Sequence, residues 1–197
     1  TADENFNTFS LSWYNNTDVD PATGLTPYIN MQKVLKVCHD FVDNFDNTFS
    51  NLLFIGQTGV GKTFLSNCIA RALMDSCHSI IYLTAGEFFD SFKSDDFKEF
   101  GSSKFDTSFF VECDLLIIDD LGTEKASDYN FSNLFNTINE RLLRRKSIII
   151  SSNLEMPDIE TRYSQRIFSR LVSAYSILRL FGDDIRCMKK LSPTKRS

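Results

Sequence analysis

Gly56-Gln-Thr-Gly-Val-Gly-Lys-Thr63 is the stretch that decides how this chain folds. It matches the pattern G-x-x-x-x-G-K-[S/T] and lies between an apolar run at 51–55 and an amphipathic segment that extends to about Met74. Glycines let the backbone curl so that its N–H groups point inward, and a helix that starts at the loop turns its positive end toward the same point. The stretch therefore predicts a phosphate-binding loop. The alternative is an ordinary glycine-rich turn.

Outward from this loop, short apolar runs alternate with segments of helical spacing. The expected strands are 51–55, 79–84, 114–119, 147–152 and 176–180. The expected helices are 26–45, 61–74, one or two within 86–112, 128–144 and 158–175. Such alternation indicates a parallel sheet covered by helices on both faces. The expected fold class is α/β, with one large domain.

The loop supplies the expected contacts to a nucleotide, ATP or ADP. These cofactor-binding residues are Gly56, Gln57, Thr58, Gly59, Val60, Gly61, Lys62, Thr63 and Phe64. Lysine at this position would neutralise the β and γ phosphates, and the Thr63 hydroxyl would bind Mg²⁺.

Acids follow the apolar run that ends at Ile118. Asp119 and Asp120 would lie at the carboxyl edge of the sheet, beside the loop. Asp119 is expected to hold Mg²⁺, through water because Mg²⁺ dehydrates reluctantly. Asp120 is expected to orient or deprotonate the attacking water. Taken alone, the pair would equally suit an acidic turn at a strand end.

Two further groups of residues are candidates for catalysis. Asn153 follows the next apolar run and could position water near the γ-phosphate, although Asn is also common after strands. Arg162, Arg166 and Arg170 are spaced four apart, which would place them on one face of a helix. They are either a solvated charged face or the source of an arginine finger that reaches a neighbouring subunit's ATP.

Composition limits the remaining possibilities. The net charge of −5 argues against strong DNA binding by the chain alone, so nucleic-acid contact would need a local basic patch or partners. Five Cys without a C-x-x-C pair and two His argue against a structural zinc site, and reduced thiols in a cytoplasmic protein are expected. No apolar run approaches 18 residues, so no membrane partner is expected.

The two ends of the chain differ from its middle. Residues 1–25 form a polar, turn-rich arm with a few aromatics. They either wrap the surface or lean on the nucleotide base. The main domain is expected over 26–188, and 189–197 is expected to be a basic tail. Because the chain begins at Thr1, we expect that an N-terminal region is missing.

Several motifs together resemble one family. They are Gly56–Thr63 with Asn67–Ala70, Leu116–Glu124, Ile150–Asn153, Gln165–Leu171 and Phe181–Arg186. In combination they resemble the AAA+ domain of bacterial replicative-helicase loaders, the DnaC/DnaI family. The related IstB-type helper ATPases of transposition share this core. The likeness runs from about residue 26 to 188.

The resemblance implies a RecA-like AAA+ P-loop NTPase core with little or no separate lid domain. Lys62 and Thr63 would belong to Walker A, Asp119 and Asp120 to Walker B, and Asn153 would be sensor 1. Arg170 would be the arginine finger, with Arg166 as second candidate. One departure is Asp120, where the broader pattern has Glu, so slow hydrolysis is expected. A sensor-2 arginine is not assignable.

The resemblance also implies partners: a DnaB-type replicative helicase, single-stranded DNA, and further copies of the chain joined through the arginine finger. Within 87–112, aromatic and basic residues interleave, as base stacking and phosphate contact would need. These are Phe88, Phe89, Phe92, Lys93, Phe97, Lys98, Phe100, Lys104 and Phe105. The same residues would equally suit a core with a solvated rim.

Four functions remain open at this point. The leading one is an ATPase that loads the helicase onto single-stranded DNA in replication initiation. A transposition helper ATPase and a nucleotide-gated switch with little hydrolysis are the alternatives, the latter because Asp120 is short. A small-molecule kinase would use the same loop, but it would need an arginine-bearing lid, and no clear lid segment is present.

Overall fold

The protein, as a computed structural model, is described over residues 4–93 and 107–191. Its strands are Leu52–Ile55 (β1), Ile80–Thr84 (β2), Leu115–Leu121 (β3), Ser147–Ser152 (β4) and Ser176–Arg179 (β5). All neighbouring strands pair in parallel, in the order β2-β3-β4-β1-β5. The predicted α/β fold with a parallel sheet is confirmed.

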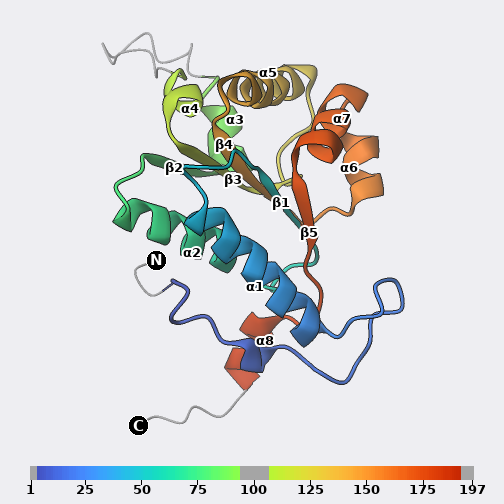
Figure 1. Ribbon diagram of the computed structural model, residues 1–197. Helices are drawn as coiled ribbons and strands as arrows, with labels where there is room; N and C mark the ends of the chain where they lie inside the picture. The colour runs from blue at the N-terminus through green and yellow to red at the C-terminus, as the bar shows by residue number, and fades with distance from the viewer. Residues whose placement is uncertain (1–3, 94–106, 192–197) are drawn as a thin grey trace.

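Along the chain, one helix precedes β1, others connect successive strands, and one follows β5. They are Pro27–Asp43 (α1), Lys62–Asp75 (α2), Ala85–Asp90 (α3), Phe109–Glu112 (α4), Asp128–Arg144 (α5), Met156–Arg162 (α6), Gln165–Ala174 (α7) and Ile185–Leu191 (α8). A short 3-10 helix, Leu11–Trp13 (η1), precedes them. Figure 1 shows α1 and α2 on one face of the sheet, with α3, α5, α6 and α7 on the other.

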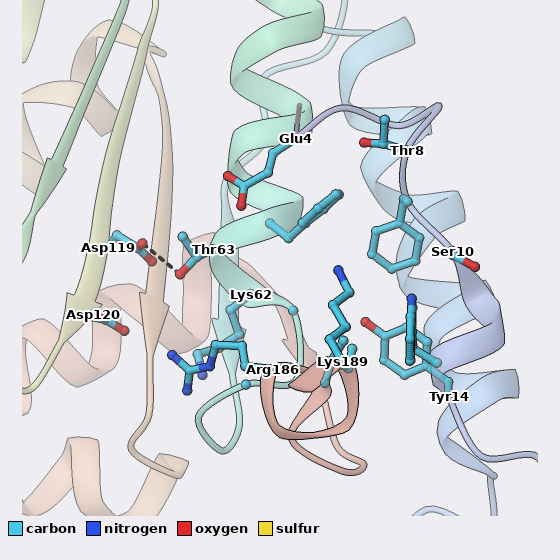
Figure 2. Close-up of a pocket in the computed structure, with 16 residues that line it drawn as sticks. Glu4, Thr8, Ser10, Tyr14, Lys62, Thr63, Asp119, Asp120, Arg186 and Lys189 are labelled. Carbon is cyan, nitrogen blue, oxygen red and sulfur yellow. Dashed lines mark hydrogen bonds between the residues drawn. The ribbon is translucent and has the colours of Figure 1, made fainter. Parts of the chain in front are cut away.

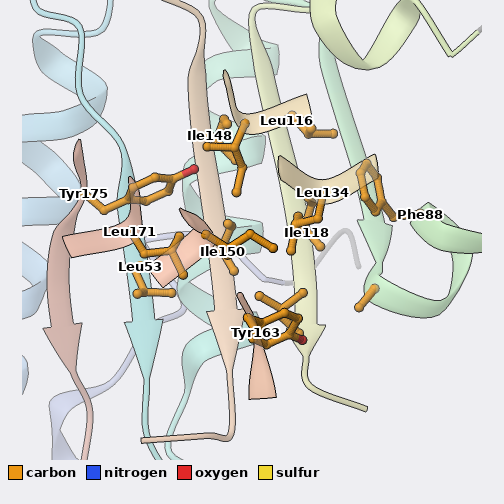
Figure 3. Close-up of a cluster of buried hydrophobic side chains, with 14 of the residues drawn as sticks. Leu53, Phe88, Leu116, Ile118, Leu134, Ile148, Ile150, Tyr163, Leu171 and Tyr175 are labelled. Carbon is orange, nitrogen blue, oxygen red and sulfur yellow. The ribbon is translucent and has the colours of Figure 1, made fainter. Parts of the chain in front are cut away.

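Successive side chains of each strand point to opposite faces of the sheet, and each face carries a hydrophobic cluster. Leu52 and Phe54 of β1 join the cluster under α1 and α2, whereas Leu53 and Ile55 join the one under α5 and α7. Figure 3 shows part of the second cluster. The central strands are buried on both faces, so their continuous apolar sequence follows from the architecture.

The prediction of one helix over 158–175 is wrong. Two helices, α6 and α7, meet at Tyr163 and Ser164, whose backbones are extended. The Ser164 hydroxyl accepts a hydrogen bond from Ile167 N at 3.5 Å and so caps α7. Arg162 therefore does not share a helix face with Arg166 and Arg170. A serine just before the apolar repeat of α7 was the overlooked start signal.

The aromatic segment over 87–112 is described only at its ends. Phe88 and Phe89 of α3 are buried, and Phe92 packs against Phe88 at 5.1 Å between ring centroids. Phe88 and Phe89 are core and the partly buried Phe92 packs against them, which contradicts a base-stacking role for Phe88 and Phe89, and Lys93 pairs with Asp90. The other candidates, Phe97, Lys98, Phe100, Lys104 and Phe105, lie outside the described residues.

The two ends of the described chain meet near the loop. The arm from Glu4 to Leu25 packs on the domain, and Figure 1 shows it passing beside α8. Helix α8 continues across the expected boundary at 188, so Lys189 is helical; residues 192–197 are not described. Within the described part of the chain, no helix combines the length and apolarity needed to cross a membrane.

Candidate functional site

The loop Gly56–Thr63 joins the carboxyl end of β1 to α2. Gly56 has φ +141°, and a Cβ there would lie 2.0 Å from the backbone oxygen of Leu180, so only glycine fits. Gly61, with φ +105°, immediately precedes α2 and offers no capping side chain, whereas the side chain of Thr26 caps α1. The first turn of α2 is thus left without a capping oxygen, which is what an external anion would need.

Lys62 is the first residue of α2 and is almost fully buried. Its ammonium group donates to the backbone oxygens of Gly56 and Gln57 at 2.6 and 2.8 Å. It also donates to Asn153 Oδ1 at 2.6 Å. Burial lowers the pKa of Lys62, and the nearby carboxylates of Asp120 and Asp119 oppose that shift.

Asp119 lies near the carboxyl end of β3 with its carboxylate buried among hydroxyl groups. Asp119 Oδ2 accepts from Thr63 Oγ1 at 2.9 Å, as Figure 2 shows, and from the Tyr82 hydroxyl at 2.8 Å. Asp119 Oδ1 accepts from the hydroxyl of Ser151 on β4. Burial first, and then the charge of Asp119, raise the pKa of Tyr82. These three donors hold the carboxylate next to the start of α2.

Asp120 has a left-handed backbone, with φ +58°. The ladder between β3 and β4 shifts register between Ile118 and Leu121, and Asp120 N donates to the Ser151 hydroxyl at 3.0 Å. Because of this bulge, the side chains of Asp119 and Asp120 point in different directions. Asp120 Oδ1 accepts from Asn153 Nδ2 at 3.4 Å, so the Asn153 amide lies between Lys62 and Asp120.

A cavity of about 440 Å³ opens in front of these groups. Its lining includes Lys62, Thr63, Asp119 and Asp120 on one side and residues of the arm on the other (Figure 2). The arm residues are Glu4, Thr8, Phe9, Ser10, Trp13 and Tyr14. The arm therefore forms a wall of the cavity rather than wrapping a distant surface.

Contacts fix the arm in this place. The hydroxyl of Tyr14, a buried residue, donates to Val60 O at 3.0 Å, and Asn67 Nδ2 donates to Glu4 Oε2 at 2.6 Å. Burial raises the pKa of Tyr14, which keeps the hydroxyl protonated as a donor. Phe9 packs edge-on against Phe64 at 5.6 Å between centroids.

Sequence reasoning missed several residues of this site. Tyr82 carries no motif, and its contact to Asp119 depends on β2 and β3 lying side by side. Arg186 and Lys189 of α8 line the cavity, and Lys189 Nζ lies 5.7 Å from the centroid of the Trp13 ring. Arg186 belongs to a quoted motif, but its place beside Lys62 follows only from the folded chain.

The candidate arginines lie elsewhere. Arg166 and Arg170 are exposed on α7 and do not line the cavity. Arg162 turns inward: it donates to Glu124 O, and its Nε lies 3.5 Å from Glu124 Oε1. The structure thus separates Arg162 from the other two.

The donor set matches what Mg²⁺ takes beside a triphosphate. Mg²⁺ is bound by one or two protein oxygens together with phosphate oxygens and water, and Thr63 and Asp119 offer a hydroxyl and a carboxylate side by side. Among the described residues, no cluster of three or more His, Cys, Asp or Glu could hold a metal ion without such a ligand.

Comparison with solved structures supports the architecture. The chain is similar to the DnaC helicase loader (TM-score 0.67, 21% identity, covering 87% of this chain and 96% of that one). It is also similar to AMPPCP-bound DnaA from Aquifex aeolicus (TM-score 0.69, 19% identity, covering 85% and 54%). These likenesses confirm the AAA+ P-loop fold.

Sequence comparison gives two relatives and one family. The chain is 23% identical over 151 residues to the replicative helicase loader DnaC of Escherichia coli K12, covering 76% of this chain and 61% of that protein. It is 32% identical over 111 residues to the phage-like element PBSX protein XkdC of Bacillus subtilis 168, covering 53% and 40%. The chain thus spans less than two thirds of the length of these relatives. The model of the IstB-like ATP binding protein family matches residues 29–192, so the chain belongs to that family.

Proposed function

We propose that this chain binds and hydrolyses ATP with Mg²⁺ and couples that cycle to loading a replicative helicase onto single-stranded DNA. The observation that carries the ATPase proposal is the meeting of five residues at one edge of the sheet. Lys62, Thr63, Asp119 and Asp120 line one cavity, and Asn153 bonds to both Lys62 and Asp120. Membership of an ATP-binding family supports it.

Phosphate binding falls to the loop. Its glycines and the uncapped start of α2 would face the phosphates, and phosphate oxygens would replace acceptors that now surround the Lys62 ammonium. Thr63 and Asp119 would hold Mg²⁺, which neutralises charge on the phosphates. Gln57, Thr58, Gly59, Val60 and Phe64 complete the expected contacts, and Arg186 adds a positive charge at the same cavity.

Water activation falls to Asp120, with Asn153 as its partner. The Asn153 amide bridges Lys62 and Asp120, so it is placed to orient a water between the acid and the γ-phosphate. Aspartate is one methylene shorter than glutamate, so its carboxylate reaches less far. We therefore expect slow turnover by the chain alone.

Assembly of several copies would supply an arginine to each ATP site from the neighbouring chain. Arg170, or Arg166 as second candidate, is exposed and outside its own chain's cavity, so either one could act only on the nucleotide of another copy. An arginine finger stabilises charge in the transition state for phosphoryl transfer. A head-to-tail arrangement of copies would bring α7 of one chain to the cavity of the next.

The decisive test of nucleotide binding is Lys62→Ala. Because the ammonium group is the buried cation at the loop, its removal should abolish measurable binding of Mg²⁺-ATP in isothermal titration calorimetry. Lys33→Ala, an exposed lysine of α1, is the matched control and should bind as the wild type does. Unchanged affinity in Lys62→Ala would end the proposal.

The loader role needs a second experiment with partners. Phosphate release is measured with the host's replicative helicase and single-stranded DNA present, together with helicase retained on the DNA. Stimulated release with helicase deposition supports the loader. Stimulation by a transposase instead would favour the transposition helper that the family match also allows. Deposition without phosphate release would favour a nucleotide-gated switch.

A further inference from the structure

Glu124 is a buried carboxylate that the proposed chemistry does not use. Its side chain is only 3% exposed. Glu124 Oε2 accepts from Gly122 N at 2.8 Å, and Glu124 Oε1 accepts from the Tyr163 hydroxyl at 2.6 Å. Arg162 Nε lies 3.5 Å from the same Oε1. Both oxygens are therefore engaged, and they are engaged with two different parts of the fold.

The first of these parts is the turn that follows Asp120. Asp120 O accepts from Thr123 N at 3.3 Å and from Thr123 Oγ1 at 2.9 Å. Gly122, inside this turn, has φ +108°, and a Cβ there would lie 2.7 Å from Leu154 Cδ1. By holding the Gly122 N–H, Glu124 fixes the turn that sets the direction of the Asp120 carboxylate.

The second part is the joint between α6 and α7. Tyr163 ends α6 and immediately precedes Ser164, the cap of α7. Its ring is buried and packs edge-on against Phe131 at 5.2 Å between centroids, and Figure 3 shows it near the arrowhead ends of the strands. Burial and the bond to Glu124 raise the pKa of Tyr163, so its hydroxyl remains a donor.

Helix α7 has two sides with different environments. Ile167 and Leu171 are fully buried in the cluster, whereas Arg166 and Arg170 face outward. A neighbouring copy that contacts the arginine side would therefore press α7 against the core and against the residues where the helix starts. Glu124 binds Tyr163, the residue immediately before the cap of that helix.

We propose that Glu124 is a positioning residue that connects the Asp120 turn to the joint before α7, so that the direction of Asp120 and the docking of α7 onto a neighbouring copy depend on each other. This inference rests on the proposed function, because it needs a head-to-tail assembly. In such an assembly each copy offers its cavity to one neighbour and its α7 to the other. Glu124 then links successive ATP sites.

The first test uses single variants. Glu124→Gln loses the charge opposite Arg162, and its amide cannot accept from both Gly122 and Tyr163. Tyr163→Phe removes only the hydroxyl and keeps the ring in the core. Both should retain nucleotide affinity within about twofold while turnover at saturating ATP falls on the order of tenfold to a hundredfold.

The control is Glu160→Gln. Glu160 also bridges the two helices, since it accepts from Gln165 Nε2 at 3.3 Å, but it is exposed and has no contact with the Asp120 turn. This variant should turn over ATP as the wild type does. Equal loss of turnover in Glu160→Gln, or unchanged turnover in both Glu124→Gln and Tyr163→Phe, would overturn the proposal.

The second test separates the two ends of the connection. Asp120→Asn and Arg170→Ala chains are mixed, so that an interface with one intact acid and one intact arginine can form. Glu124→Gln is then added to either chain in turn. The proposal predicts lower turnover in both cases. Loss only in the chain that supplies Asp120, or only in the chain that supplies Arg170, would overturn the connection and leave a local support.

The mixture also distinguishes this inference from the proposed function. Restored turnover in the unmodified mixture supports an arginine acting between chains, whatever Glu124 does. An inactive mixture of folded chains, in both this pairing and the one with Arg166→Ala, would overturn the assembly and the connection with it. Circular dichroism melting of each variant establishes that the chains are folded.

Discussion

Asp120 combines a chemical and a conformational demand in one residue. Its backbone is left-handed, a conformation that Asp and Asn tolerate better than most residues do. The same residue carries the carboxylate that faces Asn153. A substitution that changes both properties at once would therefore confuse loss of chemistry with strain of the turn.

Asp120→Asn separates the two demands. Because Asn accepts the same backbone conformation and has the same shape, Mg²⁺-ATP affinity should stay close to wild type. Turnover should fall by about a hundredfold or more, since the proposed general base is gone. Titration calorimetry and phosphate release measure the two quantities. Turnover that survives in Asp120→Asn would show that another group activates the water.

His78 makes the stability of the fold depend on pH. Its Nε2 lies 2.9 Å from Asp46 Oδ1 and its Nδ1 lies 3.3 Å from Leu73 O, so both ring nitrogens face acceptors. The bond to Asp46 raises the pKa of His78 above its ordinary value. A raised pKa in the folded state means that protonation favours folding, so this stabilisation is complete below about pH 6.5 and is lost as the pH rises through the folded-state pKa.

The measurement is the free energy of unfolding of the wild type and of His78→Gln by urea titration across this range of pH. Glutamine cannot carry the charge, so the difference between the two proteins should be largest at the acid end and shrink as the pH rises. A difference that stays constant with pH would contradict the prediction.

At the scale of elements, α5 is anchored by a buried arginine. Arg141 is fully buried and donates to four backbone oxygens, those of Phe110, Cys113, Asp114 and Ser147. These carbonyls lie where α4 ends and where β3 and β4 begin. Burial lowers the pKa of Arg141, with the Cys113 thiol opposing. The helix is thus tied to the amino edge of the sheet, opposite the candidate site.

Arg141→Met should destabilise the protein by on the order of 3 kcal/mol, because methionine fills much of the space but leaves several buried carbonyls without donors. Urea unfolding measures this. Arg144→Met, at the exposed end of the same helix, should change stability by about 0.5 kcal/mol or less although it breaks ion pairs with Glu112 and Glu140. Equal effects of the two variants would show that the buried bonds contribute little.

Elements were predictable where their signals are local. The apolar strand, glycine loop and helix around Lys62 are specified by adjacent residues, and the structure has them where they were expected. The break between α6 and α7 was missed because apolar residues continue across it, and only the cap at Ser164 separates the helices. Arg141 shares a helix face with Leu134 and Ile138, but its partners come from other elements.

At the scale of the whole molecule, the loop, the two acids and Asn153 could be placed together from sequence, since parallel strands end at one edge. The arm was expected at the nucleotide only as one of two alternatives. Tyr82, Arg186 and Lys189 could not be placed, because Tyr82 reaches Asp119, and Arg186 and Lys189 reach the cavity, only through packing between segments distant in sequence. Arg166 and Arg170 are a different case. Their spacing can be seen in the sequence, yet in the folded chain both lie outside that chain's own cavity.

Because Arg170 lies outside its own chain's cavity, any action on a nucleotide depends on assembly. If Arg170 acts on a neighbour's nucleotide, turnover per chain should rise with protein concentration, because only associated chains have a complete site. In Arg170→Ala, Mg²⁺-ATP should bind as in the wild type, but turnover per chain should stay flat at the low level of the isolated chain.

The measurement is phosphate release across a dilution series, with association followed by analytical ultracentrifugation on the same samples. Arg166→Ala is tested beside it, since it is the second candidate. A matched control is Arg71→Ala, an exposed arginine of α2 that pairs only with Asp75 among the described side chains; its turnover should follow the wild-type curve. Concentration-dependent turnover that survives in both Arg170→Ala and Arg166→Ala would exclude α7 as the source of the finger, because no other arginine was placed on its exposed face.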